Sequence, residues 1–207
     1  MSEPRVPVAR GPERAQAQRE RILAAAKKCF VEHGFHAASM GVIAHEAGMS
    51  PGLIYRYYDS KSTIIVAIMA RQLEESRESI RKLNSAGDFA EAIFATYSHW
   101  RDRDSTVMSA ALFAEMSAEA TRDPAVAAAL RTTDQAIRDE LCQVISTGVA
   151  KSSGKEIAPD LAARRALALQ CFIEGLAIRA MREPELDPEV MKVVISGFFD
   201  ALYDMAK

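Results

Sequence analysis

Apolar residues recur at helical spacing along most of this chain, three or four positions apart. Strict alternation of apolar and polar residues, which is typical of half-buried strands, is missing from the sequence, and β-branched residues do not cluster. Glycine, proline and capping residues divide the pattern into successive segments. The pattern therefore predicts an all-α fold.

The first long helix is expected from about residue 12 to residue 33, with Ile22, Ala26 and Phe30 buried. A fourth helix should begin near Lys61 and bury three apolar residues, Ile64, Ile68 and Leu73. Later helices are expected at about 89–101, 105–121, 124–147, 159–181 and from 188 onward, with a surface loop at 151–155.

Between the first and fourth helices, the sequence predicts two short helices around a turn. Ser39 can cap the first of them with its hydroxyl, and Ile43, Ala44 and Ala47 then share one face. Gly48 follows, where a left-handed backbone is most easily adopted. The chain should reverse direction at this glycine.

The second short helix should start at Ser50 and Pro51, a capping hydroxyl followed by a proline at the first helical position. Ile54 and Tyr58 are four residues apart and can face the core. The opposite face then holds small, basic and aromatic residues that suit a DNA groove: Pro51, Gly52, Leu53, Arg56 and Tyr57. An ordinary helical hairpin with packed aromatic residues is the alternative.

Three ordered segments carry a family resemblance: ILAAAKKCFVEHGF (Ile22–Phe35), SMGVIAHEAGMSPGLIYRYY (Ser39–Tyr58) and DSKSTII (Asp59–Ile65). They resemble the N-terminal domain of the tetracycline-repressor (TetR) family of one-component regulators. The resemblance covers roughly the first third of the chain, and the remainder is similar only in being helical and of the usual length.

The resemblance implies specific roles in DNA binding. Bases would be faced by Pro51, Gly52, Leu53, Arg56 and Tyr57. Phosphates would be contacted by Tyr55 and Lys61, while Ser39 would act as a capping or phosphate-contacting hydroxyl and Ser50 would start the recognition helix. It also implies a homodimer whose two heads read a palindromic operator.

The sequence departs from the family pattern in two places, the pair Gly41–Val42 and Tyr58. Gly41 and Val42 stand where a polar, helix-favouring pair with an acidic residue is more common, and glycine destabilises a helix interior by roughly 1 kcal/mol relative to alanine. Tyr58 replaces the commoner phenylalanine, so its hydroxyl needs a partner. The pose of the first short helix is therefore less firmly specified.

Charge is unevenly distributed, although the net charge is only −2. Residues 1–62 carry nine Lys or Arg and six Asp or Glu, a net +3, and the remainder carries a net −5. A basic end on an acidic body fits a protein that meets phosphates at one end. Residues 1–12 form an expected disordered arm, which could follow the DNA backbone or make no contact.

These features divide the chain into an arm at 1–12, a DNA-binding domain at 13–62 and an effector-binding and dimerisation domain at 63–207. No segment has the roughly 20 apolar residues of a spanning helix, and no signal-peptide core is seen, so we expect no membrane contact and a cytoplasmic location. The three cysteines, Cys29, Cys142 and Cys171, are expected to be buried, reduced thiols.

The last two predicted helices are apolar on more than one face, whereas a surface helix needs one apolar stripe. A two-fold four-helix interface is the simplest way to cover the surplus, and a larger monomer core is the alternative. The expected interface residues are Leu167, Phe172, Gly175, Leu176, Val194, Phe198 and Leu202.

Aromatic and flexible apolar side chains gather in the middle helices, where they could line an effector pocket with a few polar anchors. The candidates are Phe94, Tyr97, His99, Trp100, Met108, Phe113, Glu115 and Met116. A plain hydrophobic core would give the same pattern.

The sequence lacks a G-x-S-x-G elbow and a phosphate-binding glycine loop. His33 and His36 have no ligand at metal spacing, so no metal or cofactor is expected and an enzyme is disfavoured. We expect a homodimeric, ligand-responsive regulator that releases a double-stranded DNA operator when a small apolar or amphipathic effector binds. The alternatives are an activator, an effector-independent architectural factor and a small helical enzyme or carrier.

Overall fold

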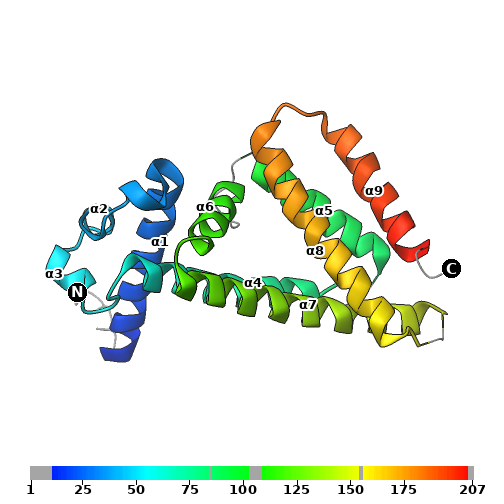
Figure 1. The fold of residues 1–207 in the computed structure, drawn as a ribbon, viewed down its shortest axis with the longest axis horizontal. Coiled ribbons are helices and arrows are strands. Elements are labelled where there is room, and N and C mark those ends of the chain that lie inside the picture. The colour runs from blue at the N-terminus through cyan, green and yellow to red at the C-terminus, as the bar shows by residue number, and fades with distance from the viewer. Residues whose placement is uncertain (1–10, 84, 103–108, 154–155, 205–207) are drawn as a thin grey trace, which may run out of the picture. The chain divides into compact units, whose positions relative to one another are not determined.

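The computed structural model describes residues 11–83, 85–102, 109–153 and 156–204. Every regular element in these ranges is a helix, so the predicted all-α fold is confirmed (Figure 1). The chain divides into two compact units, with the boundary after Ile68. We call residues 11–68 the head and residues 69–204 the body, and we describe each by itself.

The head contains α1 (Gly11–Ala37), α2 (Met40–Glu46), α3 (Pro51–Ile54) and the first residues of α4 (Lys61–Arg81). The predicted core residues of α1, which are Ile22, Ala26 and Phe30, are fully buried. Helix α2 packs on α1 and α3 packs on α2. The head therefore encloses an apolar core of its own.

Helix α1 extends further than the sequence predicted, because a last helical turn reaches Ala37 beyond a break. The break is at Gly34, where φ is 76° and ψ is 161°, a conformation that glycine adopts readily. The predicted end at His33 coincides with this break. At the other end α1 begins at Gly11, and residues 1–10 of the expected arm lie outside the described residues.

The body contains the rest of α4 together with α5 (Ala86–Arg101), α6 (Ala110–Ala120), α7 (Pro124–Ser153), α8 (Pro159–Arg182) and α9 (Pro188–Asp204). Helix α8 packs against α5, α6 and α7, while α9 packs against α5. The core between them is apolar and includes Phe89, Tyr97, Leu141, Leu169, Ile195 and Phe199.

Three predicted details of the body are wrong. Helix α7 continues through residues 151–153, which we expected in a loop, because no proline stops it and Gly148 alone does not end it. Helix α5 starts three residues before the predicted start at Phe89, because Ser85 and Asp88 form a capping box. Leu73 is half-buried rather than buried.

The helix expected from residue 105 is described only from Ser109, whose hydroxyl accepts a hydrogen bond from the Leu112 amide and so caps α6. Residues 103–108 lie outside the described part of the chain. None of the helices that the structure describes is long and apolar enough to cross a membrane.

Candidate nucleic-acid interface

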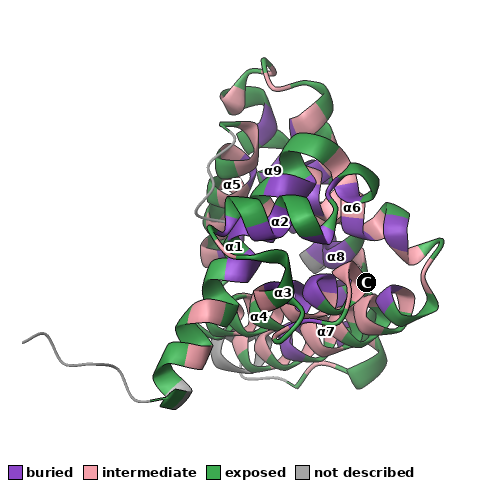
Figure 2. Cartoon of the chain, turned by 90° about the vertical axis from the view of Figure 1, so that its left-hand side faces the viewer, coloured by how far each residue is buried: buried purple, intermediate pink, exposed green. Residues whose placement is uncertain are grey.

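Helix α2 is capped as the sequence predicted. The Ser39 hydroxyl oxygen accepts a hydrogen bond from the Val42 amide at 3.2 Å. Met40, Ile43 and Ala44 are buried, and the remaining residues of α2 lie on an exposed face (Figure 2). Helix α2 thus forms despite a glycine at its second position.

The turn after α2 requires a glycine. Gly48 has φ of 60°, which confirms the predicted left-handed residue. A Cβ at this position would lie 2.5 Å from Nη2 of Arg21, and that same nitrogen donates to the Gly48 carbonyl oxygen at 3.1 Å. Arg21 of α1 therefore holds the turn, a role that the sequence pattern did not indicate.

Helix α3 starts without the predicted hydroxyl cap. Ser50 has the extended backbone of an N-cap residue, but its side chain makes no capping hydrogen bond. Its carbonyl oxygen instead accepts from the amides of Leu53 and Ile54 at 2.9 and 3.4 Å. Pro51 has no amide hydrogen, so the first turn has one donor fewer to satisfy.

The sequence predicted one helix through Tyr58, but α3 ends at Ile54 and a turn follows it. Ile54 is fully buried and Tyr58 is 9% exposed, so both face the core. Burial raises the pKa of the Tyr58 phenol, which stays neutral at physiological pH. The other residues of this segment face outward. Pro51, Gly52, Tyr55 and Arg56 are exposed, and Leu53 and Tyr57 are half-buried.

Helix α1 supplies a further basic group beside this outer face. The Arg19 guanidinium carbon lies 5.9 Å from the centre of the Tyr57 ring. In the sequence Arg19 was only one of several arginines in a basic segment. Its place could not be found by spacing, because it depends on how α1 packs in the head.

Lys61 lies at the start of α4, and its ammonium caps the C-terminal end of α1. Its Nζ donates to the carbonyl oxygens of Phe35 and His36, at 2.6 and 3.2 Å, and lies 4.5 Å from the centre of the Phe35 ring. The sequence predicted only a phosphate contact for this residue. A cation at a helix C-terminus also balances the helix dipole.

Helices α1 and α2 are joined by an ion pair between Lys28 and Glu46, whose Nζ and Oε1 are 2.7 Å apart. Their hydrogen bond raises the pKa of Lys28 and lowers that of Glu46. Both groups are solvated, with exposed fractions of 54% and 36%, so the pair adds little stability.

The predicted effector residues occupy the body in different ways. Tyr97 and Met116 are buried, and the Tyr97 hydroxyl makes no hydrogen bond with the described residues. Four of the predicted residues are half-buried: Phe94, Trp100, Phe113 and Glu115. His99 is exposed, and Met108 lies outside the described residues. Phe94 and Trp100 pack against the hydrophobic core.

A cavity of about 370 Å³ does occur in the body, but other residues line it. The lining residues are Leu83 and residues of α4 and α7, and none of them was among the predicted effector residues. Aromatic spacing could not reveal this cavity, since its walls are mainly charged and polar. Among the described residues, no three His, Cys, Asp or Glu side chains group as metal ligands.

The predicted interface residues of α8 and α9 divide into two sets. Leu176 and Leu202 are only 4% and 3% exposed, so they belong to the core of one protomer. Leu167 and Val194 are 45% and 47% exposed, while Phe172 and Phe198 are half-buried and stack with ring centres 3.9 Å apart. A Cβ at Gly175 would meet nothing within 4 Å.

We expect all three cysteines to be buried from the sequence, but only Cys29 is. Cys29 is buried, Cys142 is half-buried and Cys171 is exposed on α8, one turn after Leu167. Burial raises the pKa of the Cys29 and Cys142 thiols, which disfavours the reactive thiolate.

Comparisons with known proteins agree with this arrangement. The family model "Bacterial regulatory proteins, tetR family" matches residues 22–68, and the model "BetI-type transcriptional repressor, C-terminal" matches residues 88–204. The HTH-type transcriptional regulator UidR of Escherichia coli (strain K12) is 34% identical over 152 residues, which cover 71% of this chain and 72% of UidR.

A structure of GusR from Salmonella enterica is also similar to this chain. Its TM-score is 0.73 at 26% identity, and the match covers 90% of this chain and 95% of GusR. The regulator BetI of Stenotrophomonas maltophilia (strain R551-3) is 24% identical over 187 residues, 88% of this chain and 91% of BetI. The chain therefore belongs to the TetR family of helix-turn-helix transcriptional regulators, which are not enzymes, and its C-terminal domain is of the BetI type.

Proposed function

We propose that this regulator is a ligand-responsive repressor that binds a palindromic DNA operator as a homodimer. The observation that supports it best is the outward side of α3 and of the turn after it, where Tyr55, Arg56 and Tyr57 follow α3 while Ile54 and Tyr58 are buried. A recognition helix held in this way can enter the major groove with little loss of conformational entropy.

We assign the DNA contacts from the family resemblance, and the exposure of most of these residues is compatible with it. Base edges are faced by Pro51, Gly52, Leu53, Arg56 and Tyr57, and phosphates are contacted by Tyr55 and by the exposed hydroxyls of Ser39 and Ser50. The Lys61 ammonium has three N–H groups and uses two on the carbonyls of α1, so one remains for a phosphate.

We propose that the homodimer forms through the exposed apolar stripe of α8 and α9. Large apolar side chains on α9 are unusually exposed, with Val190 at 51%, Val193 at 72% and Val194 at 47%. Leu167, Phe172, Gly175 and Phe198 extend the stripe on both helices. A second copy of the same surface would cover it by two-fold symmetry.

The dimer surface can be tested with Val194→Glu, which places a charge on this stripe, and with Val31→Glu as a control on the exposed part of α1. Sedimentation velocity should show a dimer for the unmodified chain and for Val31→Glu, and a monomer for Val194→Glu. A dimer that survives in Val194→Glu at low micromolar protein would contradict this interface.

We propose that an effector acts by shifting a population of conformations. Helix α4 belongs to both units, beginning in the head at Lys61 and ending in the body at Arg81. An effector that prefers one arrangement of the body would therefore also bias the position of the head on DNA. A cytoplasmic location goes with this function and stays a prediction.

The repressor can be tested with a reporter gene placed behind the intergenic DNA upstream of the chain's own gene. Expression of the regulator should lower the reporter signal, and footprinting with purified protein should protect two half-sites about one helical turn apart. A rise in the signal would indicate an activator. Protection without any sequence preference would favour an architectural DNA-binding protein.

A further inference from the structure

The part of the head that we propose to read DNA contains a very short helix. Helix α3 has four residues, and the turn after it carries Tyr55, Arg56 and Tyr57. We call residues 51–57 the reading segment. A single helical turn is not stable by itself, because it fixes several residues for few hydrogen bonds, and Ser50 adds no side-chain cap. Contacts with the rest of the head must therefore hold this segment in place.

Apolar packing holds the inner side of the reading segment. Ile54 is fully buried, Tyr58 is 9% exposed, and α3 packs on α2. Apolar contacts are not directional, so they press the segment onto the core without specifying how it is tilted and rotated there. Hydrogen bonds depend on angle and can specify both. The orientation of the outward side chains should thus depend on polar contacts to the rest of the head.

Arg21 of α1 makes such a contact just before the reading segment. Its Nη2 donates to the Gly48 carbonyl oxygen at 3.1 Å. The Gly48 amide, by contrast, donates to the His45 carbonyl oxygen inside the turn, at 2.9 Å. The carbonyl of Gly48 is thus the point at which Arg21 ties the turn to α1. Because the donor is charged, this bond is stronger than one between neutral groups.

Arg19 of α1 makes a contact at the last residue of the reading segment. Its guanidinium carbon lies 5.9 Å from the centre of the Tyr57 ring, within the range of a cation–π interaction. The positive charge of Arg19 also acts on the phenol of Tyr58, where it opposes the rise in pKa that burial causes. Arg19 therefore lies beside the two tyrosines at which the reading segment ends.

Both arginines extend from a part of α1 that is fixed in the core. Ile22 follows Arg21 directly and is fully buried, whereas the side chains of Arg19 and Arg21 are exposed. Their contact points lie on opposite sides of α3, with Gly48 before Pro51 and Tyr57 after Ile54. A helix of one turn is thus held from both sides by a helix that the core holds.

We propose that Arg19 and Arg21 are positioning residues for DNA recognition. They set the tilt and rotation of the reading segment against α1, so that its outward side chains meet the base pairs in one register. They act through Tyr57 and Gly48, and the bases are read by other residues. This inference rests on the proposed function, because it takes the reading segment as the part of the chain that reads DNA.

The role of Arg21 can be tested by comparing Arg21→Met with Arg14→Met in the purified full chain. Each variant removes one exposed positive charge from α1, and Arg21→Met also removes the donor to Gly48. Fluorescence anisotropy at one salt concentration gives the affinities for the upstream intergenic DNA and for a scrambled duplex. Arg14→Met should weaken both by the same factor. Arg21→Met should also lower the ratio of the two affinities about tenfold, the effect of roughly one lost base-pair contact.

The affinity ratio separates positioning from loss of folding or of charge. Unfolded molecules lower the apparent affinity for both duplexes by the same factor, and so does a lost charge, so neither changes the ratio. Circular dichroism should show that both variants keep the helical content. An unchanged ratio in Arg21→Met, in a chain that binds its own DNA selectively, would overturn the inference and leave the proposed function standing.

Hydrogen exchange of the protein without DNA tests the same contact independently of the proposed function. The amides of Leu53, Tyr57 and Tyr58 donate to carbonyl oxygens within residues 50–54. These amides should exchange faster in Arg21→Met than in Arg14→Met or the unmodified chain. Unchanged exchange would overturn the inference. Faster exchange in a chain without selective DNA binding would contradict the proposed function alone.

The role of Arg19 can be tested with a double-mutant cycle. Arg19→Met is made in the unmodified chain and in Tyr57→Leu, and the affinity for the upstream DNA is measured for all four proteins. Arg19→Met should weaken binding about two- to fivefold more in the unmodified chain than in Tyr57→Leu, because the cation acts through the ring. Equal losses in the two backgrounds would mean that Arg19 contacts a phosphate by itself, which would overturn its positioning role.

Discussion

The head and the body bury different kinds of side chain. In the described part of the head the buried residues are apolar, apart from the Tyr58 phenol and the Cys29 thiol. Among the described residues of the body, the buried polar or charged side chains are Glu119, Glu140, Arg165 and Gln170, besides the Tyr97 phenol. Buried charges contribute little net stability, because desolvation offsets their attraction. The body therefore buries polar groups that must stay paired, and the head does not.

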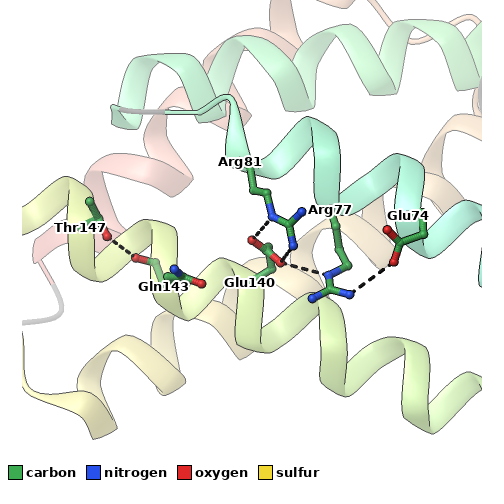
Figure 3. A network of polar contacts seen from close by, with 6 residues as sticks. All are labelled: Glu74, Arg77, Arg81, Glu140, Gln143 and Thr147. Carbon is green, nitrogen blue, oxygen red and sulfur yellow. Dashed lines mark hydrogen bonds and ion pairs between the residues drawn. The ribbon is translucent and has the colours of Figure 1, made fainter.

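The ion pairs of the two units show the same contrast. Lys28 and Glu46 of the head meet in solvent, whereas Glu140 of the body is 6% exposed and accepts three hydrogen bonds from two arginines. Hydrogen bonds from Arg81 and Arg77 lower the pKa of Glu140 against the opposing effect of its burial. The ion pair of the head is thus solvated, whereas that of the body is centred on a buried carboxylate (Figure 3).

The largest predicted effect is on the outer face of the head. Arg56→Ala should weaken operator binding by about 1–3 kcal/mol, roughly 5- to 150-fold, and relax the preference at one base pair. Fluorescence anisotropy with a panel of single-substitution duplexes measures both changes. Arg164→Ala, which removes an exposed charge from α8 in the body, should leave affinity and preference unchanged. An equal loss in both variants would mean that Arg56 acts only through total charge.

The second prediction sharpens the contrast between the ion pairs. Glu140→Gln should lower the free energy of unfolding by about 1–2 kcal/mol at pH 7, because a buried set of charge-assisted hydrogen bonds is lost. Urea unfolding measures this change, and Glu46→Gln in the head should show a smaller one. Comparable losses in the two variants would remove the distinction that we draw.

The unmodified chain and Glu140→Gln also test how the stability contribution of Glu140 depends on pH. The pKa of Glu140 is lowered in the folded state, so its contribution is complete above the unfolded value of 4.5 and disappears as the pH falls through the lower folded value. The stability difference between the unmodified chain and Glu140→Gln should therefore shrink below pH 4.5. A difference that persists undiminished in acid would contradict the paired carboxylate.

The third prediction concerns Lys61, which closes α1 and is proposed to contact a phosphate. Lys61→Ala should weaken binding to all sequences and reduce the slope of log K against log salt by about one unit. It should also lower the thermal stability of the protein, because the carbonyls of Phe35 and His36 lose their donor. A lower stability with an unchanged salt slope would leave Lys61 with the structural role alone.

The smallest effect is expected at Gly41. A Cβ at this position would meet only the Ser39 hydroxyl oxygen, at 3.7 Å, so alanine fits without strain. Gly41→Ala should raise the free energy of unfolding by about 0.5–1 kcal/mol, because alanine favours the helix. The same urea titration measures it. A destabilised protein would mean that α2 needs the freedom of glycine.

Most of the head could be predicted from the sequence because its signals are local, although the hydroxyl cap expected at Ser50 does not form. Ser39, Gly48 and the pair Ile54 and Tyr58 each specify a cap, a turn or a core face within a few residues. The contacts of Arg21 with Gly48 and of Lys61 with α1 join residues 27 and about 25 positions apart, and no spacing rule predicts them.

In the body the sequence predicted the helices but not the cavity. Tyr97 and Met116 are residue types that often line pockets, but both are buried in the core. Helical periodicity does not distinguish a pocket residue from a core residue. The cavity instead depends on Arg77 and Arg81 meeting Glu140 across two helices, 63 and 59 residues apart in sequence. Such a site follows from packing and not from local pattern.

Our central proposal is that the outward-facing residues of α3 and of the turn after it read a specific DNA sequence. It is tested most directly by the ratio of two affinities of the purified full chain at physiological salt, for its own upstream intergenic DNA and for a scrambled duplex of equal length. We expect a ratio of about a thousandfold or more, as specific regulators show. Equal affinities for the two duplexes would contradict it.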